Sequence, residues 1–274
     1  MAAPSGPAHE AADEWRFMRI NVLGPIEVIG GALPLPLVGQ RQRALLAALT
    51  LDLGKVVPVD RLIDVLWDTS PPPTARAKIQ AHVSALRQAI GHDARESDGL
   101  LLTIAPGYLL RRELVELDLA EFDSLTAEAS RSGQPGIASS LLAAALALWR
   151  GSPFADVTSP AIRNAGEKIA ERRMLAVEAK AGADITLGRC DEVVAELSPW
   201  LAVHPFRERM RAMLMIALYR LGCRADALTL YRDGHQAMVA ELGLEPGPQL
   251  RDLQWRILVD DPALLSAARP LARA

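Results

Sequence analysis

The sequence predicts a mainly α-helical protein, in which an N-terminal α+β winged helix-turn-helix domain precedes an all-α domain of tetratricopeptide-like helical repeats. Half of the 274 residues are hydrophobic and only 4% are aromatic, and the many Leu, Ala and Val residues favour helices packed on helices. Strand patterns, amphipathic helix patterns and a Pro-Gly turn alternate within residues 16–112. Helical patterns fill residues 118–259, and part of them recurs after 34 residues. A chain of this length can bury two cores.

The first domain is expected to begin with short strands and two short helices. The strands are predicted at residues 17–23, 26–29 and 33–37, separated by Gly24-Pro25 and Gly30-Gly31. Gln40–Leu51 follows as a helix, because its apolar residues Leu45, Leu46 and Leu49 share one face. Asp60 is placed to cap the next helix, residues 61–67.

A third helix, residues 75–90, carries the most informative pattern. Three prolines precede it and Thr74 is placed to cap it. The apolar residues that must face the core are Ile79, Val83, Leu86 and Ile90. The opposite face presents Thr74, Ala77, Lys78, Ala81, Ser84, Ala85 and Gln88, flanked by Arg76, Gln80, His82 and Arg87. Small residues let a helix enter a DNA groove, and polar or cationic side chains reach bases and phosphates. Taken alone, such a face is more often simply solvated.

A β-hairpin directly after this helix changes that preference. Asp98-Gly99 begins it, residues 100–104 read as a strand, and Pro106 and Gly107 stand in the order that a type II turn requires. The returning strand ends at Arg111. Residues 16–112 carry 12 Lys and Arg against 8 Asp and Glu, a net charge of +4, whereas residues 113–274 carry 18 against 22. A winged helix that binds double-stranded DNA is therefore predicted for the first domain.

The segments "GQRQRALLAALTLDLGKVVPVDRLIDVLW", "PPPTARAKIQAHVSALRQAIG" and "LLTIAPGYLLRR" resemble the OmpR/PhoB-type winged helix of the SARP family of antibiotic-pathway regulators. This resemblance implies that the third helix enters the major groove and that the hairpin, or wing, reaches the minor groove. It implies base contacts by Lys78, Ser84 and Arg87, supported by Arg76, Gln80 and His82. The full set of expected DNA contacts is Thr74, Arg76, Lys78, Gln80, His82, Ser84, Arg87, Gln88, Tyr108 and Arg111.

Two positions depart from the family pattern. Ala85 and Ile104 stand where related proteins carry basic residues, the second of them just before the wing turn. Fewer phosphate contacts weaken binding and flatten its salt dependence. One protomer is therefore expected to bind DNA with modest affinity. A second protomer bound beside it is expected to make up for the weaker binding.

The second half is predicted to contain seven helices. They are expected at residues 119–130, 135–149, 161–187, 191–201, 207–221, 225–241 and 248–258. The segments "LGRCDEVVAEL" and "LGCRADALTLY" place Gly188 and Gly222 one 34-residue tetratricopeptide period apart. "DLAEFDSL", "ALALWRGSPFADV" and "ELGLEPGPQLRDLQ" also resemble the bacterial transcriptional activation domain of SARP proteins. The resemblance extends from residue 17 to about residue 258, as in a small, stand-alone family member.

Other kinds of chemistry find no support in the sequence. There is no phosphate-binding loop, and five scattered histidines and two cysteines show no metal-ligand spacing, so no cofactor, metal or catalytic residue is predicted. The run Arg207–Arg211 is interpreted as a solvated helix face, with a DNA or acidic-partner contact as the alternative. Residues 1–15 are expected to be a disordered leader and 260–274 a tail, around domains at 16–112 and 113–259. A cytoplasmic, nucleoid-associated location is expected because no secretion signal or membrane span is evident.

Together these features predict a transcriptional activator of an antibiotic biosynthetic gene cluster. The resemblance implies binding to direct repeats at promoters, with two protomers on one face of the DNA, and recruitment of RNA polymerase holoenzyme through its subunits and σ factor. Alternatives are a winged-helix repressor or architectural binder, a tetratricopeptide-type adaptor, and a ligand-responsive regulator.

Overall fold

The computed structural model describes residues 18–30, 33–90 and 99–265. The predicted leader at 1–15, the end of the predicted tail and Asp98 lie outside these residues. The chain forms two compact units. Unit 1 comprises Met1–Ser124 and Ala147–Arg172, and unit 2 comprises Leu125–Leu146 and Arg173–Ala274. In the part that the structure describes, no helix combines the length and apolar character needed to cross a bilayer.

Unit 1 begins with a four-stranded sheet. Strands β1 (Met18–Asn21), β2 (Glu27–Gly30) and β3 (Leu33–Leu35) pair antiparallel. A fourth strand, β7 (Val115–Leu117), returns after the wing and pairs parallel to β1, giving the order β3-β2-β1-β7. The three N-terminal strands were predicted from the sequence, although β1 and β3 are shorter than expected and β2 is shifted by one residue. The sequence analysis missed β7.

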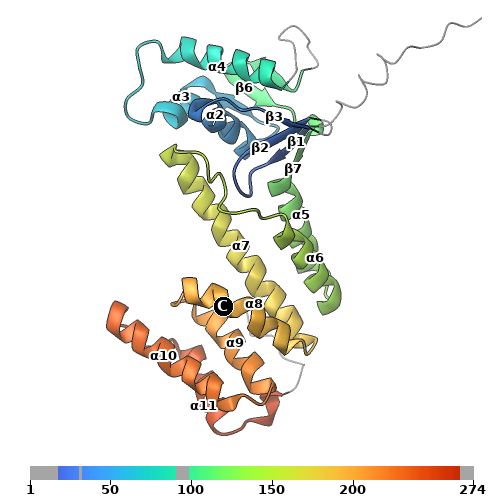
Figure 1. The fold of residues 1–274 in the computed structure, drawn as a ribbon, viewed down its shortest axis with the longest axis vertical. Coiled ribbons are helices and arrows are strands. Elements are labelled where there is room, and N and C mark those ends of the chain that lie inside the picture. The colour runs from blue at the N-terminus through green and yellow to red at the C-terminus, as the bar shows by residue number, and fades with distance from the viewer. Residues whose placement is uncertain (1–17, 31–32, 91–98, 266–274) are drawn as a thin grey trace, which may run out of the picture. The chain divides into compact units, whose positions relative to one another are not determined.

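The helices and the wing of unit 1 confirm the winged-helix prediction (Figure 1). The helices are α2 (Gln40–Leu51), α3 (Val59–Trp67) and α4 (Ala75–Ala89), and the strands are β4 (Val56–Pro58), β5 (Leu101–Ile104) and β6 (Gly107–Leu110). These strands form a second sheet in the order β4-β6-β5. The predicted cap of α3 is wrong, because Asp60 lies inside the first turn and the N-cap is Pro58. Thr74 is the N-cap residue of α4, as predicted, but its side chain makes no capping hydrogen bond.

The wing turn also differs from the prediction. The Ala105-Pro106 peptide bond is cis, and Gly107 does not have a positive φ, so the turn is not type II. Gly107 is needed for another reason. A Cβ atom there would lie 1.8 Å from the carbonyl oxygen of Val57, so only glycine lets β6 approach β4 this closely.

A return segment, residues 150–159, brings the chain back onto the winged helix of unit 1. Arg150 N donates to Leu23 O at 2.8 Å. The Asp156 carboxylate accepts a hydrogen bond from Ile26 N at 2.9 Å and pairs with Arg43 at 2.7 Å. These contacts join the return segment to the β1–β2 turn and to α2.

The start of α5 (Asp118–Arg131) makes a second such connection. The buried Asp118 carboxylate accepts hydrogen bonds from Val22 N at 2.8 and 2.9 Å and from Leu23 N at 2.9 Å. Burial raises the pKa of Asp118, although these backbone bonds and the nearby Arg150 act in the opposite direction.

The domain bounds at 16–112 and 113–259 stay a prediction.

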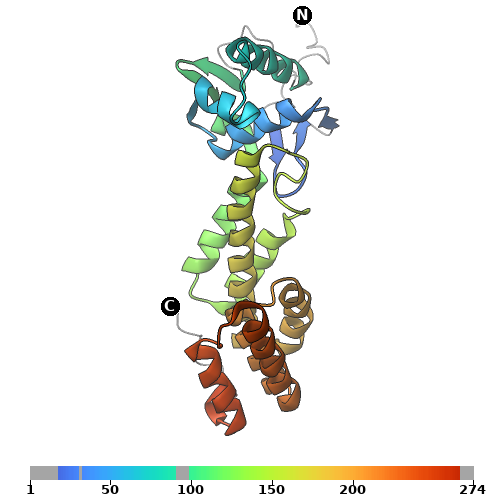
Figure 2. The same ribbon diagram turned by 90° about the vertical axis from the view of Figure 1, so that its left-hand side faces the viewer.

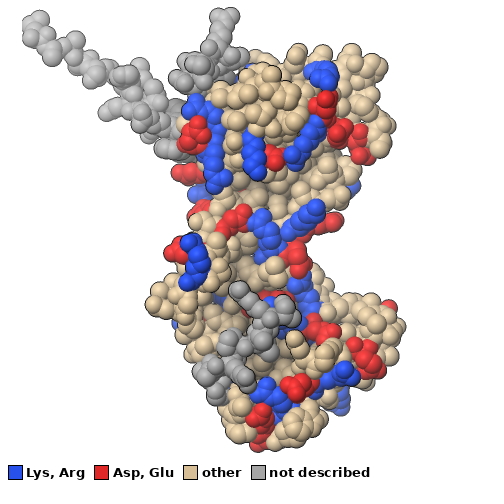
Figure 3. All heavy atoms as spheres, turned by 180° about the vertical axis from the view of Figure 1, so that it is seen from behind, with Lys and Arg blue, Asp and Glu red and all other residues tan. Residues whose placement is uncertain are grey.

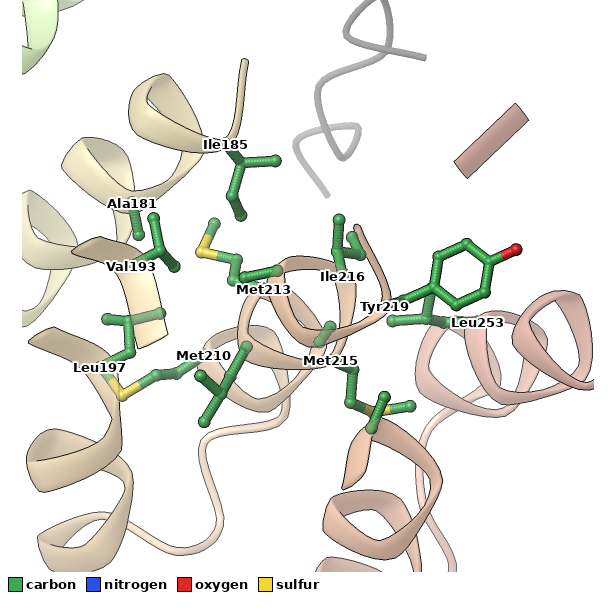
Figure 4. Packing of buried hydrophobic residues seen from close by; sticks show 14 of the residues in the cluster. Ala181, Ile185, Val193, Leu197, Met210, Met213, Met215, Ile216, Tyr219 and Leu253 are labelled. Carbon is green, nitrogen blue, oxygen red and sulfur yellow. The ribbon is translucent and has the colours of Figure 1, made fainter. Parts of the chain in front are cut away.

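Unit 2 is helical and is arranged around α9. All seven helical segments predicted for residues 118–259 are found: α5, α6 (Pro135–Ala147), α7 (Pro160–Thr186), α8 (Cys190–Val203), α9 (Glu208–Arg220), α10 (Arg224–Leu242) and α11 (Pro248–Leu258). Residues 210–217 of α9 are all buried. Figure 4 shows Val193 and Leu197 of α8 on one side of α9 and Leu253 of α11 on the other. The central helix therefore has packing partners around its circumference.

The 34-residue repeat is visible in the backbone. Gly188 and Gly222 end corresponding helices with φ of 78° and 81°. Just after them, Arg189 N donates to Asp184 O, and 34 residues later Cys223 N donates to Leu218 O, both at 2.9 Å. Both turns thus use the same hydrogen-bond arrangement, and the tetratricopeptide-like prediction is confirmed.

The run Arg207–Arg211 is not a solvated face, and the predicted interpretation is wrong. Arg207 and Arg209 both reach the buried carboxylate of Glu178 on α7, at 3.2 and 3.5 Å. Arg211 is buried and donates to the carbonyls of residues 205 and 230, each at 2.7 Å. A Cβ atom on Gly234 would lie 2.3 Å from the Arg211 guanidinium carbon. The run therefore holds helices of unit 2 together.

Candidate nucleic-acid interface

Helix α4 lies on the outside of unit 1, with α2 and α3 on its inner side (Figure 1). The predicted rotation of this helix is confirmed, because its core residues are buried: Ile79, Val83, Leu86 and Ile90. The exposed residues of the opposite face are Thr74, Ala77, Lys78, Ala81, Ser84 and Gln88, with Arg76 and Gln80 at one side. A face of small, polar and cationic residues is compatible with close approach to the edges of base pairs.

The cations of α4 differ in how they are held. The exposed Lys78 makes no ion pair with any residue that the structure describes. Arg76 pairs with Asp60 at 2.5 Å, and both side chains are largely exposed. Exposed ion pairs contribute little, about 0–1 kcal/mol, so Arg76 can exchange this carboxylate for a phosphate at small cost. Lys78 is the cation most directly available on this face.

Arg87 is engaged with the wing. Its Nε and Nη2 atoms donate to Leu101 O at 3.0 and 2.8 Å, and Nη2 also donates to Thr103 Oγ1 at 2.9 Å. The wing strands (green) lie beside α4 (teal) in Figure 2. The guanidinium therefore joins the end of α4 to β5. This position fits a residue that fixes the wing better than one that reads a base.

His82 lies at the other edge of α4. Its ring centroid is 6.4 Å from that of Trp67 on α3, and its side chain is half-buried. Burial lowers the pKa of His82, and the positive charges of Arg41 and Lys78 lower it further. This environment disfavours the protonated ring, so His82 is poorly suited to supply a positive charge for phosphate binding. Ala85, which also lies on α4, is half-buried.

Two of the expected DNA contacts do not lie on this face. Tyr108 is only 6% exposed and belongs to β6, between Val57 of β4 and Thr103 of β5. Arg111 donates to Glu113 at 2.8 Å, and its side chain is mostly buried. A backbone hydrogen bond and Arg111 lower the pKa of Glu113. These two residues support the hairpin from within, and the proposed interface omits them.

The sequence analysis missed Arg41 and Trp67. The guanidinium carbon of the exposed Arg41 lies 5.4 Å from the centroid of the Trp67 ring, which itself faces His82. The sequence offered one signal, since the first turn of α2 carries two arginines, Arg41 and Arg43. No periodicity argument joins α2, α3 and α4 at one point, so the cluster emerges only in three dimensions.

Charge is mixed over the face of the protein seen in Figure 3. Seen from behind, Lys and Arg side chains form a row across unit 1, with Asp and Glu between and beside them (Figure 3).

Among the described residues, no group of His, Cys, Asp and Glu side chains could hold a metal ion.

Both halves of the chain match known families. Residues 36–110 match the family "Transcriptional regulatory protein, C terminal", and residues 117–258 match "Bacterial transcriptional activator domain". Regulatory protein DnrI of Streptomyces peucetius is 34% identical over 257 residues, which are 90% of this chain and 94% of that protein. Regulatory protein AfsR of Streptomyces coelicolor is 39% identical over 272 residues, which are 97% of this chain but 26% of AfsR. The chain thus spans about a quarter of that relative.

One solved structure resembles the chain along most of its length. It is Mycobacterium tuberculosis EmbR in complex with a low-affinity phosphopeptide, with a TM-score of 0.83 and 35% sequence identity. The match covers 91% of this chain and 68% of that chain.

Proposed function

Because this chain belongs to the SARP family of bacterial transcriptional regulators, which joins an OmpR/PhoB-type winged helix to a bacterial transcriptional activator domain, we propose that it activates an antibiotic biosynthetic gene cluster. It would bind direct repeats at promoters and recruit RNA polymerase. The chain is a regulator and not an enzyme.

The exposed face of α4, with the wing held beside it by Arg87, carries this proposal. The major groove of B-DNA admits an α-helix, and a groove-bound helix reads bases with the side chains on its outer face. Lys78 and Ser84 are the proposed base contacts, and Thr74, Arg76, Gln80 and Gln88 the proposed flanking contacts. Each is exposed on or beside that face, whereas the core residues of α4 are turned inward.

One chain offers a single such helix, so two protomers are required to read two direct repeats. Repeats spaced by about one helical turn would place both protomers on the same face of the DNA. A homodimer on DNA is therefore proposed.

The helical half is proposed to contact RNA polymerase holoenzyme, including its σ factor. Residues 113–274 carry 18 Lys and Arg against 22 Asp and Glu, a balance that suits a protein partner better than a polyanion. The protein would act in the cytoplasm at the nucleoid. The core of unit 2 fills the space around α9, and the hollow that Leu228 of α10 and Gln254 of α11 line lies on the outer side of that core. Ligand binding by the helical half is the less favoured interpretation.

Footprinting and transcription in vitro test the proposal together. The purified full chain is expected to protect paired repeats in the promoter regions beside its own gene and to stimulate transcription there by purified RNA polymerase holoenzyme. Lys78→Ala should weaken both effects. Lys168→Ala, which changes an exposed lysine on α7 of the same unit, serves as the matched control and should change neither.

The other outcomes separate the alternatives. Protection without stimulation would indicate a repressor or an architectural binder. Absence of protection at moderate salt would indicate an adaptor that does not act on DNA.

A further inference from the structure

We propose that Arg41, supported by the Trp67 ring, is a second DNA-backbone contact at the edge of α4 opposite the wing, and that it binds a phosphate of the duplex. This inference rests on the proposed DNA binding. It adds contacts from α2 and α3, whereas the expected DNA contacts come only from α4 and the wing.

The first argument is the position of Arg41 relative to α4. The Arg41 guanidinium lies over the Trp67 ring at 5.4 Å, and that ring lies 6.4 Å from the ring of His82 on α4. Arg41 and Lys78 both lower the pKa of His82, so two cations from different helices approach the same side chain. Arg41 is therefore close to α4 although it belongs to α2.

The second argument is geometric. His82 and Arg87 are five positions apart, which separates them by about 140° around a helix. Arg87 joins α4 to the wing, so the Arg41 side of α4 is the side that the wing leaves open. The two phosphate backbones run along both edges of a major groove about 12 Å wide. A cation at each edge of the helix can contact one backbone each, and Arg41 supplies one at the edge that the wing does not reach.

The third argument is how Arg41 is held. Two nearby side chains of α2 are bound to the return segment: Gln40 Nε2 donates to Asp156 O at 2.9 Å, and Arg43 pairs with the Asp156 carboxylate at 2.7 Å. Gln40 Oε1 also accepts a hydrogen bond from Thr158 N at 3.1 Å. Arg41 itself is exposed and forms no ion pair with any described residue. Stacking on an aromatic ring restricts the guanidinium while leaving its N–H groups available for a phosphate.

The test uses a labelled 25-base-pair duplex of random sequence, because a phosphate contact does not depend on base identity. Fluorescence anisotropy with the full chain is measured between about 50 and 200 mM KCl. Arg41→Gln should bind more weakly, and its log–log salt slope should be smaller by about 0.9, which is the effect of one lost phosphate contact. Across this salt range the wild type should then lose about threefold more affinity than the variant.

Arg163→Gln is the matched control, because Arg163 is an exposed arginine on α7 of the same unit. It should keep the slope of the wild type. Unfolding of Arg41→Gln in urea should match the wild type, which separates a lost contact from a lost fold.

A second measurement requires no DNA. In NMR titrations Arg41→Gln should raise the pKa of His82, because it removes a neighbouring positive charge. Arg163→Gln should leave that pKa unchanged.

The outcomes distinguish the two proposals. If the wild type binds neither this duplex nor the promoter repeats, the proposed function fails. If the wild type binds with a clear salt slope and Arg41→Gln keeps the same slope, the Arg41 contact alone is overturned. An unchanged pKa of His82 in Arg41→Gln would overturn the placement of Arg41 beside α4.

Discussion

Replacing Arg87 with Ala removes the side chain that joins the end of α4 to the wing strand β5. Three hydrogen bonds, at 2.8, 2.9 and 3.0 Å, are lost together. Hydrogen bonds from charged donors contribute about 1.5–3 kcal/mol each, but these share one half-exposed side chain and are not additive. The free energy of unfolding is therefore expected to fall by about 2 kcal/mol, measured in urea.

The effect on DNA distinguishes fixing the wing from reading a base. A wing that is no longer fixed should weaken binding to a promoter duplex and to a random duplex by a similar factor, about tenfold. For the free energy of unfolding, Arg76→Ala is the matched control on the same helix, because its exposed ion pair with Asp60 contributes about 0–1 kcal/mol. For DNA binding the control is Arg163→Ala, which changes an exposed arginine on α7 of the same unit and should leave both affinities unchanged. If Arg87→Ala lowers only sequence-specific affinity and leaves unfolding unchanged, Arg87 reads bases and the reasoning above is refuted.

Three further predictions concern other parts of the molecule. Ile104→Arg, at the 39% exposed end of β5, should tighten duplex binding and steepen the salt slope by about 0.9; unchanged affinity in anisotropy would mean that the wing does not approach DNA. Gly234→Ala should lower the free energy of unfolding by about 3–5 kcal/mol by displacing the buried Arg211 guanidinium. Adding Arg211→Met should recover part of this loss, and additive effects in urea would contradict the close contact. Asp118→Ala leaves buried N–H groups without their acceptor and should cost about 2–4 kcal/mol; a thermal midpoint within about 1 °C of the wild type would contradict this.

The sequence was sufficient for features that depend on periodicity or on local turns. The buried face of α4 follows from four apolar residues at helical spacing. The 34-residue repeat follows from two glycines at equivalent turns. Their matching positive φ values give the physical reason why glycine recurs at this spacing. Seven helices of the second half were predicted because each is long and rich in helix-forming residues such as Ala and Leu.

Features that depend on distant partners could not be predicted. Asp60 has the right type and position for a helix cap, but it pairs with Arg76 sixteen residues later. The β7 strand has only three residues, and its partner β1 lies almost 100 positions earlier. Arg211 was grouped with its charged neighbours, although Gly234 on another helix provides the space that buries it. In each case the deciding group is far away along the chain.

The return segment has a consequence for anyone who recombines regulators of this family. Unit 1 is made from two stretches of chain, Met1–Ser124 and Ala147–Arg172, with part of unit 2 between them. A chimera with a single crossover at residue 112 would separate the DNA-binding helices from Asp118 and Asp156, which bind the backbone of the turn between β1 and β2. Any single crossover that keeps all of unit 1 also transfers residues 125–146 from the same parent. Exchanging the DNA-binding part alone therefore requires three junctions, near residues 124, 146 and 172.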